Sequence, residues 1–359
     1  MSSIFSTTIW LNVTSIFAIL YAIYLSSKSD NKLLKGSGIN IISLIIITLT
    51  TIYIGTRPVW CYADTKLYTT IFTLVQNGNW SELPSVAIEP FWTFVEYTCI
   101  ELTDASGWLF VIATFYVIGM CIAAYRWLPK HFLIAIVFLL TAFSFWGYAT
   151  NGIRNGMATS IAMLGLSFFC RSKKEMIIGY GLLILASLTH KSTLLTIATA
   201  TVALYLRNTK FNITFWLFCI VLGLLFQEQF KSLFSGLIDD GRMAAYLNAE
   251  VSKEFFSNTG FRWDFLLYSA LPIFIGWIAT YKKSINDKTY SFILHTYIFS
   301  NAFWVLINTA AYSNRFAYLS WFLYPIVLVY PFCKFKFLQN QSLILGLLLV
   351  GMATFTYFM

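Results

Sequence analysis

Long runs of apolar residues alternate with short polar connections along the whole chain. A helix that crosses a bilayer needs about 20 mostly apolar residues, and many of these runs are close to that length. The pattern therefore predicts an all-α polytopic membrane protein with about twelve transmembrane helices, over residues 5–25, 39–55, 107–125, 132–149, 153–170, 176–190, 192–206, 213–227, 263–281, 289–308, 316–333 and 342–359.

Composition agrees with this prediction and narrows the class of protein. Hydrophobic residues make up 58% of the 359 residues and charged residues only 11%, whereas a soluble domain carries roughly 25% charged residues. So few charges cannot cover a water-facing surface, which argues against a cytosolic enzyme, a disordered regulator or a disulfide-stapled secreted domain. Residues 1–359 are predicted to form a single transmembrane domain.

Two connections are long, residues 56–106 and residues 228–262. Long connections in compact proteins are usually functional. Within the first, aromatic and aliphatic residues recur at helical spacing from Thr65 to Val75 and from Pro90 to Leu102. These segments predict short amphipathic helices at the membrane interface, with simple packing on the lipid surface as the alternative.

The distribution of charge predicts the orientation. Alternate connections gather 15 basic and three acidic residues, a net charge of +12, and the opposite set has nine basic and twelve acidic residues, a net charge of −3. Cytoplasmic connections are enriched in Lys and Arg. We therefore expect the +12 side to be cytoplasmic, with both long loops and both termini outside. No basic cluster typical of nucleic-acid binding is present.

The outer side holds five of the eight arginines but only four of the sixteen lysines. Topology does not distinguish the two residue types, whereas a guanidinium suits bidentate binding of phosphate. Arg154 and Arg315 each fall where a helix is predicted to start at the outer surface, and a helix start favours an anion. Pairing with an outer acid, or with lipid phosphate, is the alternative. The outer arginines that could bind an anion are Arg57, Arg154, Arg242, Arg262 and Arg315, with Arg154 and Arg315 as the sharpest cases.

Three outer residues are candidate general bases: Asp64, Glu89 and His190. A carboxylate in an apolar cleft, or a histidine at the end of a span, can accept a proton near neutral pH. The structural alternatives are an ion pair of Asp64 with Arg57, a helix cap for Glu89 and a hydrogen-bonded helix end for His190. Four further acidic residues of the loops are expected on solvated faces: Glu96, Glu101, Asp239 and Asp240.

Aromatic and polar side chains near these residues are candidate sugar contacts or supports. Arg242 precedes Tyr246 by one helical turn, a spacing that can grip a sugar phosphate and stack on a pyranose ring. Asn151 is placed to cap the helix of Arg154. The supporting candidates are Tyr68, Asn151, Lys191, Tyr246 and Arg262.

No spacing of Cys, His or Asp predicts a metal site, and no glycine-rich phosphate loop is present. We therefore expect neither metal nor cofactor. An outward site has no access to ATP or nucleotide sugars, so a donor carried by the membrane, such as a lipid diphosphate, is the consistent substrate.

The order of these motifs resembles the EpsG/Wzy-type polysaccharide (O-antigen) polymerases of bacterial envelopes. The likeness spans nearly the whole chain and rests on Gly55-Thr-Arg57 with Asp64 and Tyr68, Glu89-Pro-Phe, Asn151-Gly-Ile-Arg154-Asn with Ala158 and Ala162, His190-Lys-Ser192, Arg242 with Tyr246, and Asn314-Arg315-Phe.

The resemblance implies a GT-C-like, metal-independent, inverting glycosyltransferase of the bacterial inner (plasma) membrane, with its site facing the periplasm or exterior. It would join oligosaccharide repeat units carried on undecaprenyl diphosphate, in the biosynthesis of lipopolysaccharide or a similar glycan, and a chain-length regulator is a possible partner. Arg154 and Arg315, helped by Arg57 or Arg242, would hold the donor diphosphate, and Asp64, Glu89 or His190 would deprotonate the acceptor hydroxyl.

Other functions fit the same features less well. A flippase or transporter of lipid-linked oligosaccharides would need a polar path on both sides of the membrane, yet the polar groups gather outside. An O-antigen ligase would share the donor site and use a different acceptor. An acyltransferase would need a cytoplasmic acyl donor, and His131 alone gives weak support for that.

Overall fold

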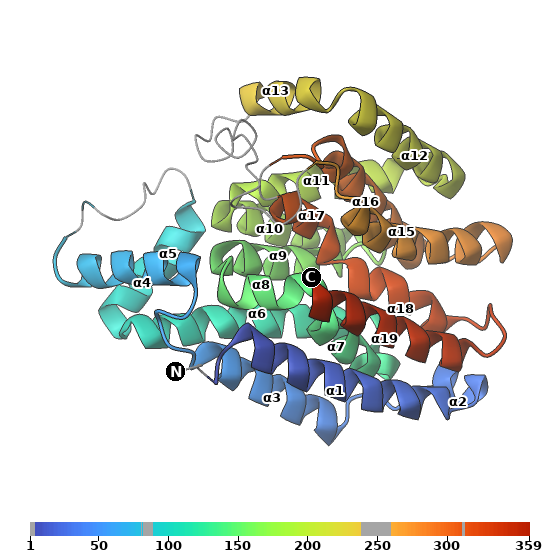
Figure 1. The fold of residues 1–359 in the computed structure, drawn as a ribbon, viewed down its shortest axis with the longest axis horizontal. Helices are drawn as coiled ribbons and strands as arrows, with labels where there is room; N and C mark the ends of the chain where they lie inside the picture. Colours follow the sequence, from blue (N-terminus) through green and yellow to red (C-terminus); the bar gives the residue numbers. More distant parts are fainter. Residues whose placement is uncertain (1–3, 80, 82–88, 238–259, 311–312) are drawn as a thin grey trace. The chain divides into compact units, whose positions relative to one another are not determined.

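The computed structural model describes residues 4–79, 81, 89–237, 260–310 and 313–359, and within that part of the chain every regular element is a helix (Figure 1). Each of the twelve apolar runs predicted above coincides with helical structure. The prediction of an all-helical chain is therefore confirmed for the described residues.

The helices group into two compact units, residues 1–197 with 329–359, and residues 198–328. The helices of the first unit are α1 (Thr7–Ser26), α2 (Asp30–Lys35), α3 (Ile41–Gly55), α4 (Ala63–Gln76), α5 (Pro90–Leu102), α6 (Ala105–Trp127), η2 (Pro129–His131), α7 (Phe132–Thr141), α8 (Phe143–Thr150), α9 (Ile153–Leu166), α10 (Lys173–Thr189), η3 (Lys191–Thr193) and α19 (Gln341–Phe358).

The second unit contains α12 (Thr209–Leu225), α13 (Gln227–Leu237), α15 (Trp263–Trp277) with the π-turn η4 (Ile278–Lys282), α16 (Lys288–Leu306) and α17 (Ser313–Trp321). The boundaries between the units fall within α11 (Leu194–Tyr205) and α18 (Tyr324–Lys334).

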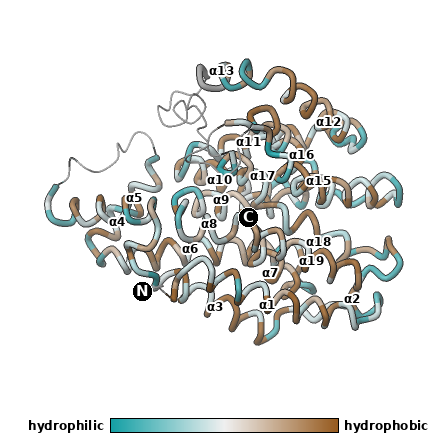
Figure 2. Tube along the Cα trace, in the orientation of Figure 1, coloured by the Kyte–Doolittle hydropathy of each residue, from teal (hydrophilic) through white to brown (hydrophobic). Residues whose placement is uncertain are grey.

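Several helices are long and apolar enough to cross a membrane. Within the described residues, five segments meet this description, and up to seven do so if each bent helix pair counts as one span. The five are Thr7–Ser26, Ala105–Trp127, Trp263–Lys282, Ser313–Lys334 and Gln341–Phe358. Figure 2 shows hydrophobic residues along much of α1, α3 and α19, and hydrophilic residues mainly at helix ends and connections. The chain is therefore a multi-pass membrane protein.

The chain bends sharply at two helix breaks, and one of them divides a predicted run. The run 132–149 divides at Ala142, where the extended backbone (ψ 136°) separates α7 from α8, and the two segments are bent by 71°. At the end of α12 the chain turns by 97° into α13. Neither break contains proline or glycine, so the hydrophobic pattern alone does not reveal it.

Polar caps define many of the helix starts. Asn40 accepts a hydrogen bond from the Ser43 backbone at 2.9 Å, and the Ser43 side chain lies 3.3 Å from the Asn40 backbone nitrogen, which makes a capping box for α3. Asp104 caps α6 by accepting from Gly107 at 2.8 Å. Such caps satisfy N–H groups that the first helical turn leaves unpaired, and they fix where each apolar segment begins.

Glycine allows close packing of α9 and α10 in the first unit. A Cβ on Gly165 would lie 2.9 Å from the carbonyl oxygen of Gly179, and a Cβ on Gly179 would lie 2.9 Å from the carbonyl oxygen of Gly165. Small residues at such crossings let helix backbones approach in a bilayer, where packing replaces the hydrophobic effect. This crossing holds together the two helices that carry Arg154 and His190.

The two predicted amphipathic segments of the first long loop are helices. Thr65 to Val75 lies within α4, and Pro90 to Leu102 is α5. Both pack against α6 and against each other, and α5 also packs against α10. In the second loop, residues 238–259 lie outside the described part of the chain.

Candidate functional site

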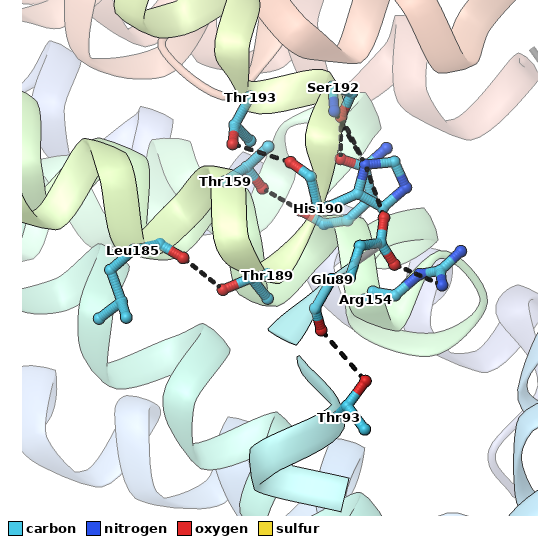
Figure 3. Close-up of polar contacts among 10 residues, drawn as sticks. Glu89, Thr93, Arg154, Thr159, Leu185, Thr189, His190, Ser192 and Thr193 are labelled. Atoms are coloured by element: carbon cyan, nitrogen blue, oxygen red, sulfur yellow. Dashed lines mark hydrogen bonds and ion pairs between the residues drawn. The ribbon is translucent and has the colours of Figure 1, made fainter. Parts of the chain in front are cut away.

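Glu89 and Arg154 form a buried ion pair in the first unit. Glu89 Oε2 lies 2.5 Å from Arg154 Nη1, and the two residues are only 4% and 5% exposed. Figure 3 shows the Glu89 carboxyl group between Arg154 and His190. Two opposite charges removed from water in this way attract strongly, but they also remain costly to separate or to leave unpaired.

Local sequence positions both members of this pair. Glu89 is the N-cap residue of α5 (φ −143°, ψ 71°) and precedes Pro90, which disfavours helical backbone at the residue before it. Its side chain makes no capping hydrogen bond, so the carboxyl group is directed to Arg154 instead. Arg154 is in the first turn of α9, as the sequence predicts.

Glycine shapes the start of α9. A Cβ on Gly156 would overlap the carbonyl oxygen of Tyr148 in α8. The glycine after Arg154-Asn155 therefore lets the first turn of α9 lie directly on α8. This close packing helps to fix the position of the arginine.

His190 lies beside the ion pair, with Nδ1 4.0 Å from Glu89 Oε1. It ends α10 and precedes η3, and its Nδ1 accepts a hydrogen bond from the Ser192 backbone N–H at 3.2 Å. Because a backbone N–H can only donate, Nδ1 is the acceptor and the neutral ring carries its proton on Nε2. His190 is therefore both a helix-end residue and a potential hydrogen-bond donor through Nε2.

Ser192 and Asn155 extend this arrangement. The Ser192 hydroxyl lies 2.8 Å from His190 Nδ1 and donates to Asn155 Oδ1 at 3.1 Å. Asn155 follows Arg154 directly, so the hydroxyl connects the helix end of His190 to the first turn of α9. Thr193 also donates to the His190 carbonyl at 3.0 Å. The imidazole is thus held in one orientation by its own chain segment.

The start of α4 is attached to the same region. The Asp64 backbone N–H donates to Asn151 Oδ1 at 2.9 Å, and the Thr65 hydroxyl donates to the Thr150 carbonyl. Asn151 therefore caps α4 rather than α9, a role that the sequence did not predict. The structure therefore brings the predicted residues Asp64 and Asn151 together.

Arg57 is buried behind this contact, at 2% exposure. Nη1 donates to the Ile54 carbonyl at 2.7 Å, and Nη2 donates to the Thr65 hydroxyl at 3.4 Å. Burial lowers the pKa of Arg57 to about 10, although Tyr62 and Cys61 act in the opposite direction. Arg57 thus stays positively charged at neutral pH and adds to the positive potential around Thr65.

Aromatic rings line the other side of Arg154. The guanidinium carbon is 5.5 Å from the centre of the Tyr68 ring, a cation–π distance. Tyr68 in turn lies 6.0 Å from Trp92 of α5, and Trp92 meets Trp108 of α6 edge-on at 5.5 Å. Tyr68, predicted as a sugar contact or support, therefore contacts the arginine at the centre of the cluster.

The expectation that Glu96 is solvated is wrong. Glu96 is 2% exposed on α5, and burial raises the pKa of its carboxyl group to about 7, while Arg154 and a hydrogen bond from Trp92 act to lower it. A helical projection contains the missing signal, because Glu96 falls on the face shared with Trp92, Cys99 and Ile100, all of which are buried. Charge alone predicts a water-facing position for Glu96.

The remaining predicted residues lie elsewhere. Lys191 is exposed in η3 of the first unit. Arg262 belongs to the second unit, where Nε donates to Asp264 Oδ1 at 2.9 Å and the guanidinium covers the Phe265 ring at 3.5 Å. Arg315 also belongs to the second unit and is in the first turn of α17, the predicted position. Arg242 and Tyr246 lie outside the described residues.

The cluster offers anion binding and proton transfer. Arginine, a histidine N–H and a helix start can hold an anion, and the carboxyl groups of Glu89 and Glu96 can take up a proton. Among the described residues no group of three or more His, Cys, Asp or Glu side chains has the geometry to hold a metal ion.

A comparison with protein-family models identifies the family of this chain. The model of the EpsG family matches residues 39–359. The chain belongs to the EpsG family. Comparisons with curated proteins and with solved structures give no match.

The EpsG match covers every element of the site. It includes α4, α5, α9 and the α10–η3 junction, as well as α17 with Arg315. The resemblance inferred from the motifs is therefore confirmed at the family level. EpsG membership and the apolar helices together indicate a membrane protein of polysaccharide biosynthesis, with a polymerase-like function.

Proposed function

We propose that this EpsG-family chain is a polysaccharide polymerase that joins oligosaccharide repeat units carried on a polyprenyl diphosphate such as undecaprenyl diphosphate. The observation that carries the proposal is the buried pairing of Glu89 with Arg154, 2.5 Å apart, beside His190. It combines a diphosphate ligand with a proton acceptor in one water-poor site.

The reaction needs two groups of this kind. The acceptor hydroxyl forms a bond to the anomeric carbon of the donor sugar, and the bond from that carbon to the diphosphate oxygen breaks. The electron pair leaves with the diphosphate, where Arg154 stabilises the negative charge. The hydroxyl proton passes to a carboxylate, and attack opposite to the leaving group inverts the anomeric centre.

Glu89 is the base that the geometry favours among the three candidates. Asp64 is more exposed, and His190 Nδ1 already accepts from Ser192. The donor diphosphate competes with Glu89 for Arg154 because both are anions. Donor binding therefore releases the Glu89 carboxylate toward the acceptor, while His190 donates through Nε2 to a phosphate or sugar oxygen.

Two further residues of the first unit support the glycan in this proposal, the exposed Lys191 and the ring of Tyr68 beside Arg154. The chain then has about twelve spans in a GT-C-like arrangement in the bacterial plasma membrane. Its site faces outward, and a chain-length regulator acts with it.

The test uses purified protein in lipid nanodiscs with a lipid-linked repeat unit. We expect a ladder of products in the presence of EDTA and without nucleotide, and no ladder with Glu89→Gln. Glu101→Gln, on the exposed face of the same helix, is the matched control and should give the full ladder. If the wild type forms no ladder, or if Glu89→Gln forms the same ladder, the proposal fails.

Cells distinguish the rival functions. Cells with Glu89→Gln should display single-repeat glycan on the outer side. Loss of all outer glycan would favour a flippase, and transfer of single units to a different acceptor by the wild type would favour a ligase.

A further inference from the structure

Glu96 is a second buried carboxyl group on the helix that begins next to Glu89. Its Oε2 atom has no hydrogen-bond partner in the described part of the protein, and its carboxyl group is held by a hydrogen bond from the Trp92 side chain one turn earlier. An ionised carboxylate removed from water with so few donors is costly. The function proposed above does not use this residue.

Arg154 is the charged group that faces Glu96. It interacts electrostatically with Glu96 across the α5–α9 boundary, while its Nη1 atom is already paired with Glu89. The single positive charge of Arg154 therefore interacts with two carboxyl groups at α5, those of Glu89 and Glu96. With both ionised, the local charge is net negative, which disfavours a bound anion.

Among the described residues, burial, Arg154 and Trp92 are the influences that shift the pKa of Glu96. Of the helices packed on α5, α4 contributes Tyr68 to the cluster, α10 contributes His190, and α6 contributes the indole of Trp108. On α5 itself, Cys99 interacts electrostatically with Glu96. Whether the Glu96 carboxyl group is protonated therefore depends chiefly on its burial and on which anion Arg154 binds.

We propose that Glu96 is a positioning residue of the donor site, which takes up a proton when the donor diphosphate binds to Arg154. The inference rests on the proposed function, because it requires a diphosphate at that arginine. A neutral Glu96 leaves Arg154 free to balance the incoming charge, and an ionised Glu96 repels it.

The pH dependence has a definite sign. The pKa of Glu96 is raised to about 7 by burial, so the neutral form prevails below this pH and the ionised form above it. A polyprenyl diphospho-sugar is a diester whose phosphates stay ionised throughout this range. If only the neutral form of Glu96 admits the donor, linkage gives affinity about tenfold weaker at pH 8 than at pH 6.

The test measures binding of farnesyl-diphospho-N-acetylglucosamine to the full chain in nanodiscs between pH 6 and pH 8. We expect the tenfold loss of affinity in the wild type and in Glu101→Gln. In Glu96→Gln, which is neutral at every pH, we expect affinity close to the pH 6 value of the wild type and no loss at pH 8. A fall in Glu96→Gln equal to that of the wild type would overturn the proposal.

A second measurement does not depend on folding of a variant. Calorimetry of wild-type binding at pH 7.5, in buffers of different ionisation enthalpy, should show net proton uptake. Binding without proton uptake contradicts the role of Glu96 and leaves the proposed polymerase intact. Absence of binding at every pH contradicts both.

Discussion

Glu89 Oε2 and Arg154 Nη1 lie 2.5 Å apart and join the starts of two helices, since Glu89 is the N-cap of α5 and Arg154 is in the first turn of α9. Each is buried, so neither charge is screened by water. A structural ion pair of this kind resists substitution of either partner because the other is then left uncompensated. A functional pair behaves differently, because an incoming anion can replace the carboxylate and preserve the charge balance.

Replacing Arg154 tests the anion-binding half of the site. Arg154→Ala is expected to reduce the rate of polymerisation by about 100-fold or more, the range found when one group that stabilises transition-state charge is removed. Arg154→Lys should recover only part of the activity, because a lysine cannot form the bidentate contact. Product ladders timed with a lipid-linked repeat unit provide the measurement.

The control for Arg154 is Arg207→Ala, since the Arg207 side chain is exposed and its Nε donates to the nearby Leu204 carbonyl. It should polymerise at the wild-type rate. Equal losses of activity in Arg207→Ala and Arg154→Ala would show that the loss follows from removing any one positive charge and not from removing Arg154 in particular.

His190→Asn separates the two roles of the histidine. Asparagine can still accept the Ser192 backbone N–H as a helix cap, but it lacks the Nε2–H. We expect thermal stability near that of the wild type and about a tenfold loss of turnover. A variant that folds normally and polymerises at full rate would restrict His190 to the structural role.

Ser192→Ala tests the orientation of the imidazole. The hydroxyl lies 2.8 Å from His190 Nδ1 and donates to Asn155 Oδ1, and its removal leaves the Ser192 backbone N–H as the hydrogen-bond donor to Nδ1. We expect a severalfold fall in turnover with little change in donor affinity. Ser187→Ala, which removes an exposed hydroxyl bonded to the Ile184 carbonyl, is the control, and unequal effects of the two variants are required.

Glycine substitutions in α10 test the helix crossing beneath the site. Gly179→Ala should cost about 1–3 kcal/mol of unfolding free energy, because its Cβ meets the Gly165 carbonyl oxygen at 2.9 Å and cannot be accommodated without a backbone shift. Gly181→Ala, with nothing within 4 Å of its Cβ, should be neutral or stabilising by up to about 1 kcal/mol. Unfolding in mixed detergent micelles gives both values, and equal effects would contradict the packing argument.

The sequence predicts the helices well because their signal is local. The limits of α5 follow from Pro90 at its start and from the period of its apolar residues, and Arg154 at the start of α9 follows from the Asn-Gly before it. The breaks at Ala142 and after Leu225 depend on tertiary packing, so the residues there carry no local sign of them.

The sequence indicates the members of this cluster better than the contacts between them. Chemistry and helix position single out Glu89, Arg154 and His190 one by one, but their proximity depends on the packing of α5 against α10 and of α9 against α10. The burial of Glu96 and the contact between Ser192 and His190 depend on the same packing. A single sequence does not contain this information in any local pattern.

Helix α5 has one buried face and one exposed face. Glu96 and Trp92 are on the buried face, whereas Phe94, Tyr97 and Leu102 are 64%, 49% and 78% exposed. Substitutions on the open face leave the carboxyl geometry intact. Drift among relatives that handle different glycans is therefore expected to accumulate there, while the inward face stays nearly invariant.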